Sequence, residues 1–178
     1  MKKTALLTTL LTSFLYAKAG FYAGANYGSV QESFKNYDDQ ETTLQKIALK
    51  VGYGDINAYA IEFSLEQMQT DKEVFSQNDS ARYNFNVELL KAFNFKTFFN
   101  PYMKAGFGTG QMKMSNKQER LRYGSYNLGG GVFIPLLSHV DLEVGYSYRY
   151  YSYEKLDTTN KVYKSHQNSL YTGFNYRF

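Results

Sequence analysis

The most constraining feature of the chain is a two-residue alternation in its last nine residues, 170–178. Leu170, Phe174 and Phe178 fall on one face of a strand with this period, while Arg177 falls on the other. A strand requires this pattern when lipid lies against one face and a wet interior lies against the other. The C-terminal segment is therefore expected to cross a membrane as a β-strand.

The same alternation recurs through the rest of the chain. The predicted strands are 21–30, 44–53, 58–68, 81–90, 101–111, 123–134, 140–150 and the terminal strand, which opens at His166 and ends at Phe178. Most are about ten residues long, which suits the roughly 9–11 residues of a tilted transmembrane strand. The pattern predicts an all-β fold, an eight-stranded antiparallel up-and-down transmembrane β-barrel.

The predicted connections alternate in length. Those after the first, third, fifth and seventh strands are long and charged, at 32–43, 69–80, 112–122 and 151–165. Those after the second and sixth strands are short, as expected when long loops lie outside the cell and short turns face the periplasm. The link 91–100 is long and rich in Phe, so it breaks this pattern.

The two faces of the predicted strands differ in charge. None of the 34 positions assigned to the outward face is charged, although a charged fraction of 20% would place about seven there. A charge at the middle of the bilayer costs roughly 2–4 kcal/mol in a barrel. The inward face carries six bases and five acids: Lys46, Lys50, Glu62, Glu66, Arg82, Glu88, Lys104, Asp141, Glu143, Arg149 and Arg177.

The first nineteen residues have the pattern of a secretory signal. Two lysines precede an apolar stretch at 4–16, and Ala17 and Ala19 form a small-x-small cleavage site. The stretch is shorter than the roughly 20 residues of a membrane-spanning helix. We therefore expect a cleaved signal peptide at 1–19 and a single barrel domain at 20–178.

Charge and cysteine content exclude several classes of function. The net charge of the chain is +4, and removing the three lysines of the signal leaves +1, so nucleic-acid binding is not indicated. The absence of Cys excludes thiol chemistry and Cys-based metal sites. Phe and Tyr together make 18% of the chain, which suits the aromatic girdles of membrane barrels. The run Tyr146, Tyr148, Tyr150, Tyr151 and Tyr153 is assigned to such a girdle.

With these features the chain resembles the small eight-stranded outer-membrane barrels of the OmpA and OmpX type. The segments that carry the resemblance are 101–108, 126–132, 144–150 and 174–178. It implies a place in the outer membrane of a Gram-negative bacterium, reached by export across the inner membrane. It also implies that the barrel assembly machinery recognises Phe174, Tyr176 and Phe178. No segment after Phe178 corresponds to the peptidoglycan-binding domain of OmpA, so tethering to the cell wall is not expected.

The inward charges are expected to form ion pairs, since buried charges must be paired. Lys46 and Lys50 should face Glu62 and Glu66, and Asp141 and Glu143 should face Arg177. Two interpretations stay open: a structural network that fills the lumen, or a narrow ion path.

The chain offers little for catalysis or metal binding. His139 lies in a predicted turn, and His166 and Ser169 should point to opposite faces of one strand. Asp38, Asp39 and Glu41 could ligate Ca²⁺, but a solvated charged loop is the simpler interpretation. We expect no catalytic residues, no metal and no cofactor.

The third long connection is basic. Lys113, Lys117, Arg120 and Arg122 would lie near the phosphates of lipopolysaccharide, which Lys and Arg bind well. A merely solvated basic loop is the alternative.

The resulting functional prediction is a structural or surface-interaction protein. Its four polar loops would contact lipopolysaccharide, a host surface or other cells. The alternative is a small low-conductance porin, and a lipid A-modifying enzyme is a third class.

Overall fold

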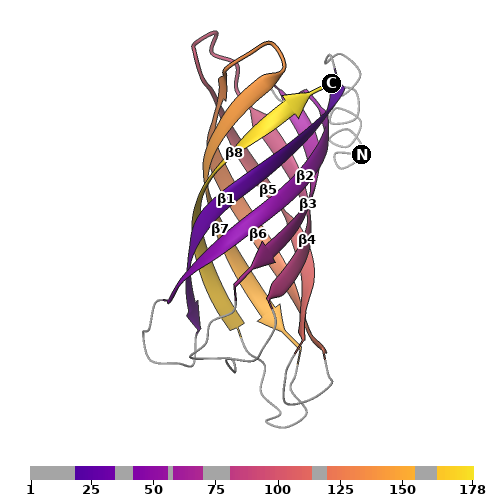
Figure 1. The fold of residues 1–178 in the computed structure, drawn as a ribbon, viewed down its shortest axis with the longest axis vertical. Helices are drawn as coiled ribbons and strands as arrows, with labels where there is room; N and C mark the ends of the chain where they lie inside the picture. The colour runs from indigo at the N-terminus through magenta and orange to yellow at the C-terminus, as the bar shows by residue number, and fades with distance from the viewer. Residues whose placement is uncertain (1–18, 35–41, 56–57, 70–80, 114–119, 155–163) are drawn as a thin grey trace, which may run out of the picture.

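The computed structural model describes residues 19–34, 42–55, 58–69, 81–113, 120–154 and 164–178. These ranges form eight strands: β1 (Gly20–Phe34), β2 (Thr42–Gly54), β3 (Tyr59–Met68), β4 (Arg82–Ala92), β5 (Asn100–Lys113), β6 (Arg120–Pro135), β7 (Val140–Tyr153) and β8 (Lys164–Arg177). Each strand pairs antiparallel with the next, and β1 pairs with β8 to close the barrel (Figure 1). The predicted eight-stranded antiparallel barrel is confirmed. Within the described ranges there is no helix of the length and apolarity needed to span a membrane.

The two ends of the barrel differ in their connections. The start of β1, the end of β8 and the links β2–β3, β4–β5 and β6–β7 lie at one end, which we call the turn end (Figure 1). The last residues of β1, β3, β5 and β7 and the first residues of β2, β4, β6 and β8 lie at the other end, the loop end. The link β4–β5, residues 93–99, is shorter than the predicted 91–100 because β4 continues to Ala92 and β5 begins at Asn100.

Most strands are longer than the sequence pattern suggested. β1 continues to Phe34, β6 begins at Arg120 and β7 continues to Tyr153, so all three include residues that were assigned to loops. The alternation of buried and exposed residues continues into these extensions, since Phe34 and Tyr153 point inward and are buried. Extension of a strand is favourable when the added inward residues still pack against other side chains.

The β2–β3 link depends on a glycine. Gly54 has a φ of 142°, and a Cβ there would lie 2.3 Å from the backbone oxygen of Tyr59. Only glycine adopts this conformation without strain. The link is closed by a hydrogen bond of 2.8 Å from the Asp55 amide to the same oxygen.

The two faces of the barrel wall are opposite in character to those of a soluble barrel. Along the middle of the strands the outward residues are mostly apolar and exposed, such as Leu49 at 63% and Phe107 at 66%. The inward face buries polar and charged residues, such as Glu62 and Arg82 at 0%, together with apolar ones. This is the arrangement of a barrel whose outer surface faces lipid.

Candidate functional site

All eleven charged residues assigned to the inward face do point into the lumen. Ten are buried and Arg177, close to the turn end, is half-buried. Their opposed charges are close enough to form ion pairs from one end of the barrel to the other. The lumen is therefore the first candidate site.

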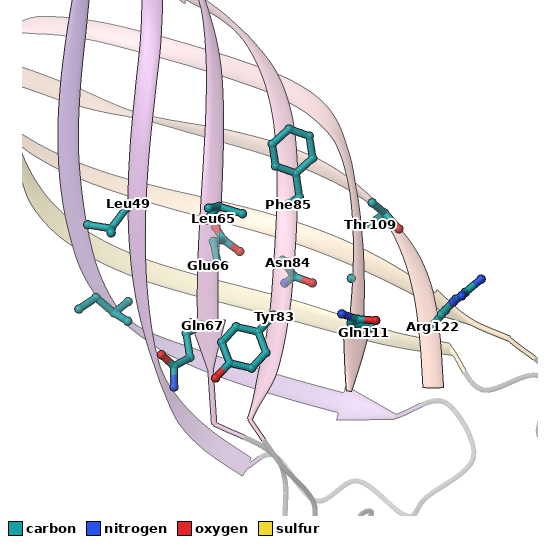
Figure 2. Close-up of a pocket in the computed structure, with 12 residues that line it drawn as sticks. Leu49, Leu65, Glu66, Gln67, Tyr83, Asn84, Phe85, Thr109, Gln111 and Arg122 are labelled. Atoms are coloured by element: carbon teal, nitrogen blue, oxygen red, sulfur yellow. The ribbon is translucent and has the colours of Figure 1, made fainter. Parts of the chain in front are cut away.

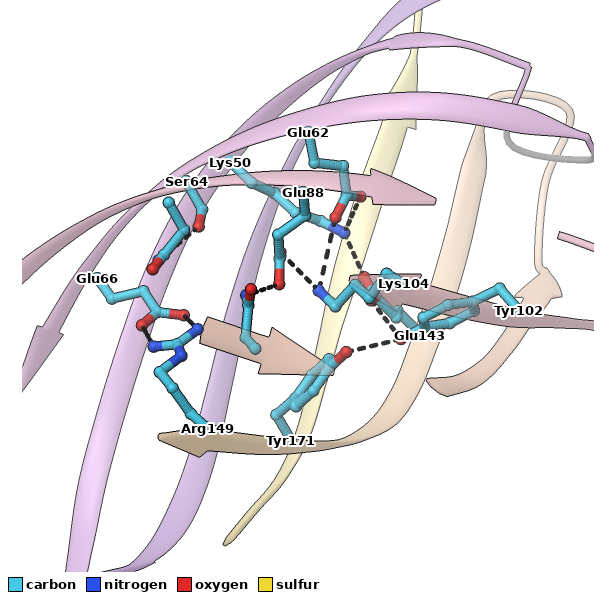
Figure 3. Close-up of polar contacts among 12 residues, drawn as sticks. Lys50, Glu62, Ser64, Glu66, Glu88, Tyr102, Lys104, Glu143, Arg149 and Tyr171 are labelled. Atoms are coloured by element: carbon cyan, nitrogen blue, oxygen red, sulfur yellow. Dashed lines mark hydrogen bonds and ion pairs between the residues drawn. The ribbon is translucent and has the colours of Figure 1, made fainter. Parts of the chain in front are cut away.

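Five of these residues form what we call the central network: Lys50, Glu62, Glu88, Lys104 and Glu143 (Figure 3). The Lys50 Nζ lies 2.8 Å from Glu62 Oε1 and 2.5 Å from Glu143 Oε2, so it joins β3 to β7 across the lumen. The Lys104 Nζ lies 3.0 Å from Glu88 Oε2 and 3.5 Å from Glu62 Oε2. Each cation thus bridges two carboxylates, which offsets the cost of burying three acids.

Tyrosine hydroxyls complete the central network. Tyr22 donates a hydrogen bond of 2.8 Å to Glu62, and Tyr102 donates one of 2.6 Å to Glu143. The hydroxyls of Tyr102 and Tyr171 are 2.8 Å apart. Gly145 makes room for this pair, because a Cβ there would lie 2.5 Å from the Tyr102 hydroxyl and 2.6 Å from that of Tyr171. Sequence reasoning missed these tyrosines, although each falls on the inward face of the alternation.

A second group of ion pairs lies nearer the loop end. The Arg149 guanidinium binds both carboxylate oxygens of Glu66, with Nη2 3.1 Å from Oε1. Lys46 Nζ lies 3.7 Å from the same carboxylate, and Arg149 also donates to the Tyr151 hydroxyl at 3.1 Å. A bidentate pair of this kind fixes both side chains.

The partner of Arg82 is a residue that the sequence analysis placed in a loop. Glu32 lies inside β1 and is fully buried, and its Oε1 accepts a hydrogen bond of 2.9 Å from Arg82 Nη1. Ser165 donates to the same oxygen at 2.8 Å. With Glu32, the described lumen holds six acids and six bases. Continuing the alternation from Val30 by one step would have found it.

Arg177 was expected to pair with Asp141 and Glu143, and one of these two pairs is present. Arg177 Nε lies 2.9 Å from Asp141 Oδ2, whereas Glu143 pairs with Lys50 instead of Arg177. Glu143 and Arg177 belong to different levels of the lumen, because the register aligns Glu143 with Gly173 and Asp141 with Asn175. The expected pairing of Lys46 and Lys50 with the two glutamates of β3 is present, since Lys50 pairs with Glu62 and Lys46 pairs with Glu66.

Apolar side chains lie on both sides of the charges. The base cluster at the turn end consists of Tyr22, Ala60, Leu90, Ala92, Tyr102 and Phe133. The mouth cluster at the loop end consists of Phe34, Met112, Leu121, Tyr123, Tyr151 and Tyr153. The assignment of Tyr151 and Tyr153 to a lipid-interface girdle is therefore wrong. They lie an odd number of residues from the outward Tyr146 and Tyr148, so they point to the opposite face and fill the mouth of the lumen.

The outer wall carries a second candidate site, the loop-end groove, of about 900 Å³ (Figure 2). The register aligns Ile47, Gln67, Tyr83, Gln111 and Arg122 in one row across β2–β6. Because the strands are tilted, this row runs from mid-barrel at Ile47 to the loop end at Arg122. Apolar side chains such as Leu49, Leu65 and Phe85 line the groove together with two glutamines, and Arg122 lies at its loop end.

The four basic residues singled out in the sequence are only partly described. Arg120 and Arg122 lie on the outward face at the start of β6 and are exposed, and Arg120 donates a 3.4 Å hydrogen bond to Gln111. Lys113 pairs with Arg120 in the β5–β6 ladder, and Lys117 lies outside the described residues. The structure therefore places Arg122 in the lining of the loop-end groove, and Arg120 contacts the lining residue Gln111.

The residues named for assembly lie on one outward stripe of β8. Phe174, Tyr176 and Phe178 are exposed, Phe178 by 77%. The Phe178 amide donates a 3.0 Å hydrogen bond to the Phe21 carbonyl oxygen at the seam with β1. Of the cleavage site, Ala19 is described and Ala17 is not.

The structure does not bring His166 and Ser169 together. His166 points outward, 2.8 Å from the Tyr148 hydroxyl, while Ser169 of the same strand is buried in the lumen. His139 lies in the β6–β7 turn, and its Nδ1 is 3.0 Å from the carbonyl oxygen of Arg177 in β8. Asp38, Asp39 and Glu41, weighed as Ca²⁺ ligands, lie outside the described residues.

Three comparisons with known proteins bear on the family. The neisserial surface protein A structure is 18% identical with a TM-score of 0.70, covering 90% of this chain and 99% of that one. Ail of Yersinia pestis in complex with the heparin analogue sucrose octasulfate is 17% identical with a TM-score of 0.58, covering 90% and 99%. OprG of Pseudomonas aeruginosa is 14% identical with a TM-score of 0.51, covering 91% and 97%. These similarities show the fold, and a search of curated proteins found no match. Residues 4–178 match the model of the outer membrane protein beta-barrel domain, and the chain belongs to this family.

Proposed function

We propose that this outer-membrane barrel is a closed structural and surface-interaction protein rather than a pore. The observation that carries the proposal is the filling of the lumen: the central network lies between the base cluster and the mouth cluster. An eight-stranded barrel has room inside for little beyond its own side chains. Ions would have to displace paired charges and two apolar layers to pass.

Conductance in planar bilayers tests this proposal. The purified protein should give no steady conductance. The double variant Glu62→Ala/Lys104→Ala removes one acid and one base from the central network, so it should admit water and conduct. The matched control Glu154→Ala/Lys164→Ala removes one acid and one base from exposed positions and should stay closed. Steady conductance of the unmodified protein that changes with Glu62→Gln would instead favour a small low-conductance porin.

The surface role requires that the loop end face the outside of the cell. Because the chain has no cysteine, single thiols can be introduced at exposed sites at either end. We expect a membrane-impermeant maleimide to label Glu154→Cys in intact cells and Thr97→Cys only after lysis. The reverse pattern would contradict the orientation. The four loops would then be available to host or cell surfaces.

The loop-end groove supports lipopolysaccharide as one partner. Its apolar length suits an acyl chain, and Arg120 and Arg122 suit a lipid A phosphate. Arg122→Gln should weaken binding of lipid A by at least about tenfold, because a charge-assisted hydrogen bond contributes roughly 1.5–3 kcal/mol. Lys164→Gln, an exposed base at the loop end of β8, is the matched control and should have no effect. Equal binding of dephosphorylated lipid A would contradict the phosphate contact.

Export and assembly complete the proposal. Cleavage after Ala19 would give a mature chain that begins at Gly20, which intact-mass measurement of the membrane-extracted protein would detect. Recognition of β8 by the barrel assembly machinery is supported by its outward aromatic stripe, Phe174, Tyr176 and Phe178.

A further inference from the structure

The outer wall has a second groove, at the opposite end of the barrel from Arg122. This turn-end groove has a volume of about 610 Å³ and lies on the outward face of β3–β7. It exists because two small outward residues, Ala105 and Gly130, lie on neighbouring strands. Larger outward side chains border them, since Ala105 pairs with Leu128 and Gly130 pairs with Tyr146.

The register gives the direction of the groove. Tyr59, Lys91, Met103, Gly130 and Tyr146 form one row across β3–β7. Tyr59 and Lys91 lie at the turn end of their strands, whereas Tyr146 lies midway along β7. Because the strands are tilted, the groove extends from the turn end of the barrel to its middle. This span corresponds to the depth of one lipid leaflet.

Lys91 lies at the turn end of this groove. The Lys91 side chain is half-buried on the outward face, with its Nζ 3.7 Å from the centre of the Tyr59 ring and 5.7 Å from that of Phe93. Lys91 makes no ion pair with any residue that the structure describes. The aromatic rings hold its ammonium at the membrane interface and leave it able to bind an anion.

The adjoining β4–β5 link is suited to contact with lipid. Phe95 and Phe98 in this link are exposed, Phe98 by 77%. Aromatic side chains concentrate where a barrel meets the headgroups. The link therefore places apolar rings at the end of the barrel where Lys91 lies.

We propose that the turn-end groove binds one anionic phospholipid of the periplasmic leaflet. Lys91 would bind the phosphate, and an acyl chain would lie over Ala105 and Gly130. A second copy of the chain fits less well, since a two-fold contact would bring two Lys91 ammonium groups together. The leaflet assignment rests on the orientation proposed above, while the binding itself does not.

Native mass spectrometry of the full folded protein with added phosphatidylglycerol or phosphatidylcholine tests the site. We expect one retained phosphatidylglycerol, held more tightly than phosphatidylcholine. Lys91→Gln should weaken phosphatidylglycerol binding about fivefold, as expected for one lysine near an anionic lipid. Ala105→Leu should fill the groove and weaken both lipids.

Two control variants test whether an effect is specific to the groove or follows from any loss of charge or any larger side chain. Lys96→Gln removes an exposed base from the β4–β5 link, and Ala25→Leu enlarges an outward residue of β1. Both should bind lipid like the unmodified protein, and heat-modifiability gels should show that every variant folds. Equal phosphatidylglycerol binding by Lys91→Gln and Lys96→Gln would overturn the proposal, as would a dimer that Ala105→Leu dissociates. Thiol labelling tests the orientation separately, so the two failures are distinguishable.

Discussion

At the scale of single residues, the barrel depends on buried charges that are matched one to another. Glu32 and Arg82 show this most clearly, because both are fully buried and the Arg82 guanidinium binds both Glu32 oxygens. Removing one partner of such a pair leaves a charge without compensation in a medium that solvates it poorly. Losing one partner is therefore expected to cost more free energy than the intact pair contributes to stability.

Glu32→Gln should lower the free energy of unfolding by about 3–5 kcal/mol, since it leaves Arg82 buried without an anion. The double variant Glu32→Gln/Arg82→Gln should lose less than the sum of the two single variants. Urea unfolding in lipid vesicles measures all three. Additive losses would show that the two side chains are not coupled.

Gly54→Ala should lower the free energy of unfolding by about 1–3 kcal/mol, because φ is 142° and the new Cβ would meet the Tyr59 carbonyl oxygen. Gly124→Ala is the matched control, since no atom lies within 4 Å of a Cβ at that position. The same unfolding measurement applies. An equal loss in both variants would rule out backbone strain at Gly54 as the cause.

At the scale of elements, each strand separates lipid from the lumen by alternation alone. In β3 the outward residues Phe63 and Leu65 are exposed, while the inward Glu62 and Glu66 are buried and paired. A shift by one residue would place two carboxylates in lipid and two apolar groups among charges. The register is therefore strongly specified.

Phe63→Lys should impair insertion into the outer membrane by roughly 2–4 kcal/mol, the cost of a base at the middle of the bilayer. Phe63→Leu keeps the position apolar and should insert normally. The folded fraction in membrane extracts, measured by heat modifiability, checks both. Normal insertion of Phe63→Lys would contradict the lipid-facing assignment of this side.

At the scale of the whole molecule, closure depends on the seam between β1 and β8. Thirteen register pairs join these strands, from Tyr22 with Arg177 to Phe34 with Ser165. Beyond them, the Phe178 amide reaches the Phe21 carbonyl oxygen and the Arg177 amide reaches that of His139. The last strand thus links the first strand and the β6–β7 turn.

Deletion of Phe178 should slow assembly in cells, because it removes a seam hydrogen bond and the last ring of the outward stripe. Pulse-chase labelling with a heat-modifiability gel gives the rate of folding. Phe178→Tyr keeps both the amide and the ring and should assemble at the normal rate. An unchanged rate on deletion would remove the role of Phe178 in assembly.

The sequence by itself determined the strand number, the closed antiparallel barrel and the two faces within the predicted strands. The period of two is a property of each strand alone. Because charge in lipid is costly, the outward face can be identified from its lack of charged residues, without knowing which strands are neighbours. The same reasoning placed eleven charges in the lumen. It stopped too early at Glu32, because the polar residues after Val30 resemble a loop when no partner is in view.

Only the tertiary structure decided which charges meet, because strand stagger sets the level of each side chain in the lumen. It brings Glu143 on β7 to Lys50 on β2, and Glu32 on β1 to Arg82 on β4. It also packs Tyr151 and Tyr153 against residues of other strands at the mouth of the lumen and aligns residues from five strands into each outer groove. Such neighbours depend on register and tilt, which arise from the closure of all eight strands together.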